Sequence, residues 1–130
     1  MHFDERTQRA LREAGLETDE IVAASDRVAE LVDDDAEAIA DFFAPDGPVQ
    51  SDMELAHSTA DLQEHPVADV ELFTHGSDIR GYLSLDGWGV PVEGGRILTT
   101  DADGTPVVVE LSLGATIHDR VRFARDPAEL

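Results

Sequence analysis

Three side chains able to bind a metal or transfer a proton recur every four positions: His57, Asp61 and His65. On one continuous helix they would form a single row, because residues four apart share a face. With His75 downstream, they could supply imidazole and carboxylate ligands to a divalent metal and leave one position open for a hydrolytic water. The alternative is a group of helix-end, capping and surface side chains, since His65 precedes Pro66 and no H-E-x-x-H pattern is present. The sequence predicts no cofactor, and a divalent metal is the one cofactor that these residues leave open.

A second set of residues combines positive charge with the alternation of a β-strand. Guanidinium groups bind phosphates and carboxylates bidentately, so this set predicts a site for an anionic ligand or for an acidic segment of a partner. The alternative is pairing across the sheet with acids such as Glu110. The set comprises His118, Arg120 and Arg122 on one expected strand, with Arg80 and Arg96 on neighbouring strands.

Two aromatic residues, Tyr82 and Trp88, flank the turn sequence Asp86-Gly87. An aromatic pair beside a hairpin can form a recognition surface or anchor a dimer. The alternative is that both are large pieces of a core otherwise built from Ala and Val. The sequence leaves these two interpretations open.

Several kinds of catalytic site are excluded by what the chain lacks. Without cysteine there are no disulfides, thiolate metal ligands or cysteine nucleophiles. No phosphate-binding glycine loop, G-x-S-x-G nucleophile turn or G-x-G-x-x-G fingerprint is present. A catalytic carboxylate pair stays open, because 29 acidic residues offer too many candidate pairs to single one out.

The elements that must position these residues divide the chain into two parts of one domain. Apolar periodicity predicts a helix over about residues 4–14, stopped by Gly15, and a second that begins at Thr18. The run Asp33 to Asp35 predicts a break before a third helix, which ends near Pro45. Residues 49–66 are ambiguous and read as one or two short helices, so the helical half spans about 1–66.

Residues 67–130 alternate between apolar runs and turn residues, which predicts five to six strands. Gly94-Gly95 is expected to be a hairpin turn, and Pro91 predicts an edge position or a bulge. Short links favour an antiparallel meander covered by the helices. The predicted fold is therefore α+β, with N-terminal helices packed on a C-terminal antiparallel sheet.

The charge of the chain points to its solvent. All nine basic residues are arginine, lysine is absent, and 29 acids give a formal net charge of −20. Such self-repulsion becomes tolerable when molar salt shortens the screening length to about 3 Å. We therefore expect a soluble protein of a salt-rich cytoplasm, with K⁺ and hydrated salt ions at its surface and neither a nucleic acid nor a membrane as partner.

Several stretches resemble a small family of uncharacterised haloarchaeal proteins. They are Met1-His-Phe-Asp-Glu-Arg-Thr-Gln-Arg-Ala-Leu, Phe73-Thr-His-Gly-Ser-Asp-Ile-Arg-Gly-Tyr-Leu, Trp88-Gly-Val, Glu93-Gly-Gly-Arg-Ile-Leu and Leu113-Gly-Ala-Thr-Ile-His-Asp-Arg-Val-Arg-Phe-Ala-Arg-Asp-Pro. The resemblance implies a class of organism and assigns no reaction or ligand.

Together these features predict a non-enzymatic protein-interaction domain, working as a homodimer or with another protein. The first alternative is a metal-dependent enzyme built on His57, Asp61, His65 and His75. The second is a binder of a small anion or nucleic acid through the arginine-rich strands.

Overall fold

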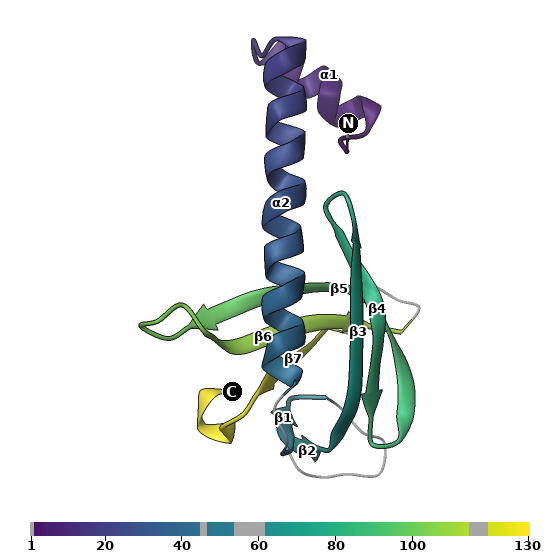
Figure 1. The fold of residues 1–130 in the computed structure, drawn as a ribbon, viewed down its shortest axis with the longest axis vertical. Coiled ribbons are helices and arrows are strands. Elements are labelled where there is room, and N and C mark those ends of the chain that lie inside the picture. The colour runs from purple at the N-terminus through teal and green to yellow at the C-terminus, as the bar shows by residue number, and fades with distance from the viewer. Residues whose placement is uncertain (1, 45–46, 54–61, 115–119) are drawn as a thin grey trace.

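The computed structural model describes residues 2–44, 47–53, 62–114 and 120–130 and has the predicted α+β fold (Figure 1). Its helices are α1 (Glu5–Glu13), α2 (Thr18–Phe43) and a short C-terminal 3₁₀ helix, η1 (Pro127–Glu129). Its strands are β1 (Val49–Ser51), β2 (Gln63–His65), β3 (Val67–His75), β4 (Asp78–Leu85), β5 (Trp88–Thr100), β6 (Pro106–Leu113) and β7 (Arg120–Ala124). The described residues thus form seven strands, not five to six, because β1 and β2 lie in the segment that was ambiguous between helices.

The first helix confirms the prediction made from its cap and its stop. The Asp4 carboxylate accepts a hydrogen bond from the Thr7 amide at 2.8 Å, and Gly15 takes a φ of 102° after the last turn. Helix α1 packs against the first turns of α2, where Ile21 is fully buried. The N-terminal segment adds a further tie, since the His2 amide donates to the Ser25 hydroxyl at 2.6 Å.

The predicted break at Asp33 to Asp35 is wrong, because α2 runs through these residues without interruption. Ile21, Val32, Ala36 and Ile39 keep a buried or half-buried stripe across the acidic run, while the three aspartates point to solvent. Aspartate lowers helix propensity only slightly, so a continuous apolar stripe outweighs three of them. Asp33 also gains a partner, since it accepts a hydrogen bond from the Thr74 hydroxyl on β3.

The seven strands form one antiparallel sheet in the order β2-β1-β7-β6-β5-β4-β3. Strands β2 and β3 are therefore at opposite edges, although only Pro66 separates them in sequence. The sheet must curl to bring its two edges to this one residue. Figure 1 shows the result, in which β3 and β4 run along α2 while β5 and β6 cross it.

Strand β5 makes this curl possible, and the predicted hairpin at Gly94-Gly95 is wrong. The strand continues through both glycines, with a register shift between Val92 and Gly94. Its residues up to Val92 pair with β4 and those from Val92 onward pair with β6. Pro91 pairs with Tyr82 of β4, and its carbonyl accepts from the Gly114 amide at 3.1 Å on the other side, so the predicted edge position is wrong. The register shift that begins at Val92 agrees with the alternative, a bulge. A Cβ at Gly95 would lie 2.9 Å from the Leu111 side chain, so this glycine lets the bent strand pack closely.

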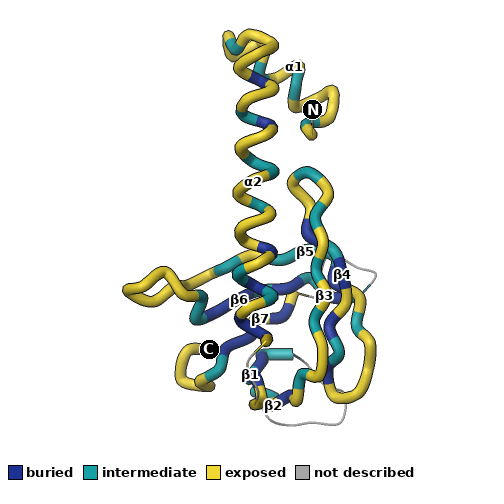
Figure 2. Tube along the Cα trace, viewed as in Figure 1, coloured by how far each residue is buried: buried dark blue, intermediate teal, exposed yellow. Residues whose placement is uncertain are grey.

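The core lies between the concave face of the sheet and the C-terminal half of α2, while the N-terminal half of the helix projects beyond the sheet (Figure 2). Phe43 packs edge-on against Phe123 of β7, with ring centroids 5.3 Å apart. Arg125 holds the end of the helix, because its guanidinium donates to the Phe42 carbonyl at 2.8 Å and to the Gly47 carbonyl at 3.0 Å. The opposite, convex face of the sheet is left to polar side chains and a few exposed aromatic ones.

Candidate functional site

A chain of hydrogen bonds runs from β1 through β2 to the β4–β5 turn. The Ser51 hydroxyl lies 2.6 Å from His65 Nε2, and His65 Nδ1 lies 2.6 Å from Asp86 Oδ2. The Met53 amide donates to the same hydroxyl at 3.3 Å. Ser51 and His65 are fully buried, whereas Asp86 is partly exposed. The chain crosses the place where the two edges of the sheet meet.

The Asp86 carboxylate determines which group donates in the hydrogen bond at its end of this series. A carboxylate accepts hydrogen bonds, so Nδ1 of His65 carries a proton and donates to Asp86. In the tautomer whose Nε2 carries no proton, this nitrogen accepts from the Ser51 hydroxyl, whose oxygen accepts in turn from the Met53 amide. All three contacts are satisfied in this way, and both ring nitrogens of His65 are held by a partner.

The same order of residues is found in serine hydrolases, where a histidine between an aspartate and a serine removes the hydroxyl proton. Here the Ser51 side chain has no exposed surface, so a substrate cannot reach its oxygen in this structure. In this structure the hydroxyl makes a buried polar contact between β1 and β2. We call Ser51, His65 and Asp86 the edge clamp.

The Asp86-Gly87 turn gives the edge clamp its reach. Asp86 has a φ of 55° and Gly87 one of 83°, the left-handed pair that a tight two-residue hairpin requires. The Asp86 amide donates to the Pro66 carbonyl at 3.1 Å, so the turn is bonded to the junction of β2 and β3 by main chain as well as side chain. Asp86 is the element by which the far hairpin contacts the opposite edge.

The four residues of the predicted metal site fall in different situations. His57 and Asp61 lie outside the described residues. His65 has both ring nitrogens occupied within the edge clamp. His75 is at the far end of the nine-residue strand β3, about 30 Å along the chain from His65 at roughly 3.3 Å per residue. Among the residues that the structure describes, no three His, Asp or Glu side chains are grouped so that they could hold a metal ion.

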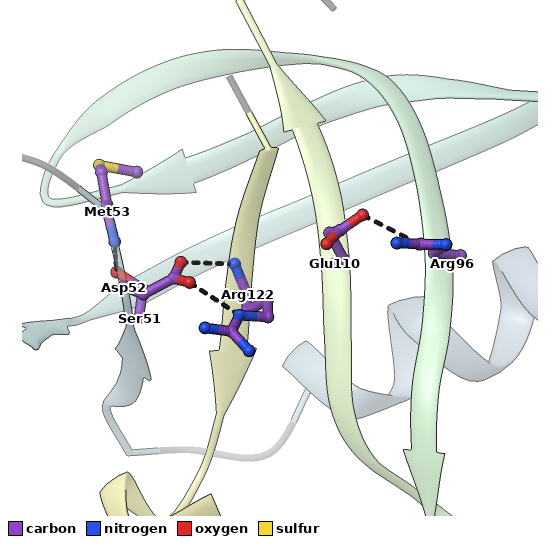
Figure 3. Close-up of polar contacts among 6 residues, drawn as sticks. All are labelled: Ser51, Asp52, Met53, Arg96, Glu110 and Arg122. Carbon is purple, nitrogen blue, oxygen red and sulfur yellow. Dashed lines mark hydrogen bonds and ion pairs between the residues drawn. The ribbon is translucent and has the colours of Figure 1, made fainter. Parts of the chain in front are cut away.

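A row of alternating charges crosses the convex face from β5 to the end of β1 (Figure 3). The Arg96 Nε donates to Glu110 at 2.9 Å, and Glu110 lies opposite Arg122 in the β6–β7 register. Both the amide and the Nε of Arg122 donate to the Asp52 carboxylate, each at 2.8 Å. These bonds to Asp52 raise the pKa of Arg122 above its ordinary value. The pairing alternative expected from the sequence thus accounts for Arg96 and Arg122.

The remaining members of the arginine set are placed apart. Arg80 forms an ion pair with Glu93, near the β3–β4 hairpin. Arg120 lies on β7, one pair further along than Arg122 and opposite Ser112 of β6. His118 lies outside the described residues. The structure therefore brings Arg96, Arg120 and Arg122 onto one face and leaves Arg80 beside a different group of residues.

That group is aromatic. Tyr82 of β4 is 60% exposed, and it lies opposite Pro91 of β5 and diagonally across from Phe73 of β3, which is 55% exposed. Trp88 is 75% exposed at the start of β5. Tyr82 and Trp88 are therefore not core residues, and their role at an interface stays a prediction. We call Phe73, Tyr82 and Pro91 the aromatic face.

Three candidate functional residues could not be identified from the sequence: Ser51, Asp52 and Phe73. Ser51 and Asp52 acquire their partners through the β1–β2 and β1–β7 pairings, and such short strands give no periodic signal. Phe73 does carry a signal, since it stands two residues from Glu71 in an alternating strand. Which face of the sheet carries Phe73 is decided only by the direction in which the sheet curls.

A protein family described as a family of unknown function (DUF7532) matches residues 1–128 of the chain. The chain belongs to this family. No curated protein matches it, and no solved structure does. Membership of DUF7532 confirms the resemblance to an uncharacterised family and assigns no reaction to the edge clamp, the charged row or the aromatic face. No helix in the described part of the chain is long and apolar enough to cross a membrane.

Proposed function

We propose that this DUF7532 protein is a non-enzymatic protein-interaction domain whose binding surface is the aromatic face. One observation carries the proposal: the chain has only seven aromatic residues of the Phe, Trp and Tyr types, and two of them, Phe73 and Tyr82, are exposed on neighbouring strands of this face. Burying one such side chain contributes about 1.5–3 kcal/mol. Burying these side chains in a core made mainly of small residues would stabilise the fold. Their exposure therefore favours a role in binding.

The charges around the aromatic face select the kind of partner. Asp69 and Glu71 flank it on β3, and Glu93 flanks it on β5, where Arg80 is already paired with it. The rim is therefore acidic around an apolar centre. A protein surface with Arg or Lys side chains around an apolar group complements it, and its guanidinium groups can also stack on Tyr82. A second copy of this chain would bring the same acids, so the homodimer predicted from the sequence is the less favoured occupant.

The size of the face indicates a transient contact. Three strands about 4.8 Å apart, over five residues at roughly 3.3 Å each, give a face of roughly 240 Å². A stable interface uses about 800 Å² per partner. We therefore expect binding that is weak and rapidly reversed unless further surface is recruited.

The setting we propose is the salt-rich cytoplasm of a haloarchaeon, supported by the net charge of −20 and by the absence of lysine. At molar salt, long-range attraction between the acidic rim and a basic partner is screened. Under those conditions the apolar contact with Phe73 and Tyr82 supplies most of the affinity. The position of aromatic groups at the centre of an acidic rim suits such a solvent.

The binding test uses isotope-labelled protein and two synthetic peptides, one alternating arginine with leucine and the other alternating glutamate with leucine. The basic peptide should shift the amide resonances of Glu71, Phe73 and Tyr82, and the acidic peptide should not. Tyr82→Ser should abolish the shifts, whereas Leu98→Ser, which removes another exposed apolar side chain, should preserve them. Equal shifts with both peptides, or shifts unaffected by Tyr82→Ser, would refute the assignment.

Light scattering over a range of protein concentrations, in about 2 M KCl to screen the charge, tests the second occupant. We expect a monomer throughout. A dimer that Tyr82→Ser dissociates would make the second copy the occupant and overturn the basic partner.

The absence of catalysis is tested at Ser51. A fluorophosphonate probe, which labels activated serine nucleophiles, should leave the native protein unmodified because the hydroxyl is buried. Labelling of Ser51 that is lost in His65→Gln would show an active triad and refute the non-enzymatic assignment.

A further inference from the structure

The convex face of the sheet contains a small polar hollow that is separate from the aromatic face. Its volume is about 190 Å³. It lies over β5, β6 and β7, beside the charged row of Figure 3. The residues that line it are Gly95, Arg96, Glu110, Ser112 and Arg120.

The hollow offers hydrogen-bond donors that the fold leaves unused. Within the described part of the chain, the side chains of Arg120 and Ser112 have no hydrogen-bond or ion-pair partner. Arg96 uses its Nε to bind Glu110, so its two terminal nitrogens remain free to donate. Two guanidinium groups and one hydroxyl therefore face the same small space.

The sheet register shows that these donors can meet on one group. Arg96 and Arg120 lie two strands apart across the sheet and two residues apart along it, because Arg96 pairs with Glu110 while Arg120 pairs with Ser112, two residues further along β6. At about 4.8 Å per strand and about 6.6 Å per residue pair, their Cα atoms are roughly 12 Å apart. Both side chains line the same hollow, so their guanidinium groups can donate to one small anion placed over the sheet. Ser112 lies between them on the middle strand.

The local charge favours an anion despite the total of −20. Glu110 is the carboxylate nearest the hollow and would repel an anion, but it accepts from Arg96 on one side and faces Arg122 on the other. Asp52, the next acid along the row, is bound to Arg122 through both oxygens. Three guanidinium groups thus lie near two carboxylates that are already hydrogen-bonded, and among the described residues no acid forms an ion pair with Arg120.

We propose that this hollow is a binding site for a phosphate group, held between Arg96 and Arg120 with the Ser112 hydroxyl as a third donor. A tetrahedral phosphate presents oxygens in several directions and so can engage donors on three strands, whereas a carboxylate presents two in one plane. The volume is below the roughly 300–1,000 Å³ of sites for drug-sized ligands. The site therefore binds a free phosphate ion or the phosphate end of a larger molecule.

The test is a titration of isotope-labelled protein with potassium phosphate, with KCl adjusted to hold the ionic strength constant. The amides of Gly94, Gly95 and Ser112 should shift and saturate with inorganic phosphate. Potassium acetate titrated in the same way should bind at least about threefold more weakly, because it can satisfy fewer of the donors. Equal binding of acetate would overturn the assignment to phosphate, and no saturable shift with either anion would overturn the site.

Arg120→Ala should weaken phosphate binding about tenfold or more, through the loss of a charge-assisted hydrogen bond. Because Arg120 has no described partner in the fold, its removal should leave the unfolding transition unchanged. The matched control is Arg27→Ala, which removes the same charge from an exposed pair with Glu30 on α2 and should leave binding unchanged. Equal losses in the two variants would reduce the effect to net charge and refute a site at Arg120. A titration of phosphoserine then separates the two sources: binding as tight as that of inorganic phosphate indicates the end of a larger molecule, and no binding indicates the free ion.

Discussion

Replacing Ser51 with alanine tests whether the edge clamp holds the two edges of the sheet together. The Ser51 hydroxyl makes two hydrogen bonds: it accepts one from the Met53 amide at 3.3 Å, and it shares the other with His65 Nε2 at 2.6 Å. The long Met53 bond is worth about 0.5 kcal/mol, but the buried Nε2 would lose its only partner, which costs about 1–3 kcal/mol. We expect Ser51→Ala to lower the free energy of unfolding by about 2–3 kcal/mol. That is a large share of the roughly 5–15 kcal/mol typical of a domain.

The measurement is urea unfolding followed by circular dichroism in about 2 M KCl, because urea is uncharged and leaves the screening constant. Ser84→Ala is the matched control. Ser84 lies on the outward face of β4, and its hydroxyl has no hydrogen-bond partner among the described residues. Replacing it should change stability by less than about 0.5 kcal/mol.

A second variant in the same clamp tests the coupling. Asp86→Asn keeps an oxygen that can accept from His65 Nδ1, and asparagine tolerates the φ of 55° at this turn. It should cost about 1 kcal/mol, the difference between a charge-assisted bond and a neutral one. Combined with Ser51→Ala, the loss should fall short of the sum by about 0.5–1 kcal/mol, since both act through one imidazole. A Ser51→Ala variant as stable as Ser84→Ala, or strict additivity in the double variant, would refute the clamp.

Three further predictions follow from other parts of the fold. Gly81→Ala should lower stability by about 2–3 kcal/mol or more in urea unfolding, because its Cβ would lie 1.9 Å from the Glu71 carbonyl oxygen. The Cβ of the control variant Gly89→Ala would meet nothing within 4 Å, so this change should be nearly neutral. Equal losses of stability in the two variants would contradict the close approach at Gly81. The thermal unfolding midpoint should rise steadily as KCl is raised from about 0.1 M to 2 M, since screening relieves a net charge of −20, and a flat or falling midpoint would contradict the salt-adapted reading. The amide of Thr7 lowers the pKa of Asp4 below its ordinary value of 3.8. This cap therefore stabilises the fold above pH 3.8 and loses its effect as the pH falls through the lowered pKa. The wild-type protein should thus be more stable than Asp4→Asn at pH 7, and the difference in stability should vanish in acid.

Much of the fold follows from local signals in the sequence. The limits of α1 could be predicted because Asp4 and Gly15 act within one turn of the chain. The continuity of α2 through Asp33 could not, because it depends on which helix residues the sheet buries. Gly95 shows the same limit, since Gly-Gly allows a turn and a close approach equally well, and only Leu111 on the neighbouring strand decides between them.

The candidate sites depend on long-range pairing and were less accessible. His65 attracted attention as one of a four-residue repeat, yet its partners are 14 residues before it and 21 after it. The arginines of β5 and β7 were recognised as a face because alternation is local, but the identity of their acids was not. Asp52 binds Arg122, which lies 70 residues further along the chain. The strand pairing that brings them together involves a strand of three residues, which is too short to be recognised from the sequence.

The distribution of charge links the two proposed surfaces. On the convex face Arg96 and Arg122 are ion-paired with Glu110 and Asp52, whereas Arg120, two residues from Arg122 on the same strand, has no ion pair with any described residue. Arg6, Arg9 and Arg12 of α1 also have no ion pair among the described residues, so the lack of an acid partner alone does not set Arg120 apart. What distinguishes Arg120 is its place in one small hollow with Arg96 and Ser112. The variant Arg120→Ala should therefore weaken phosphate binding while leaving both the fold and the aromatic face intact.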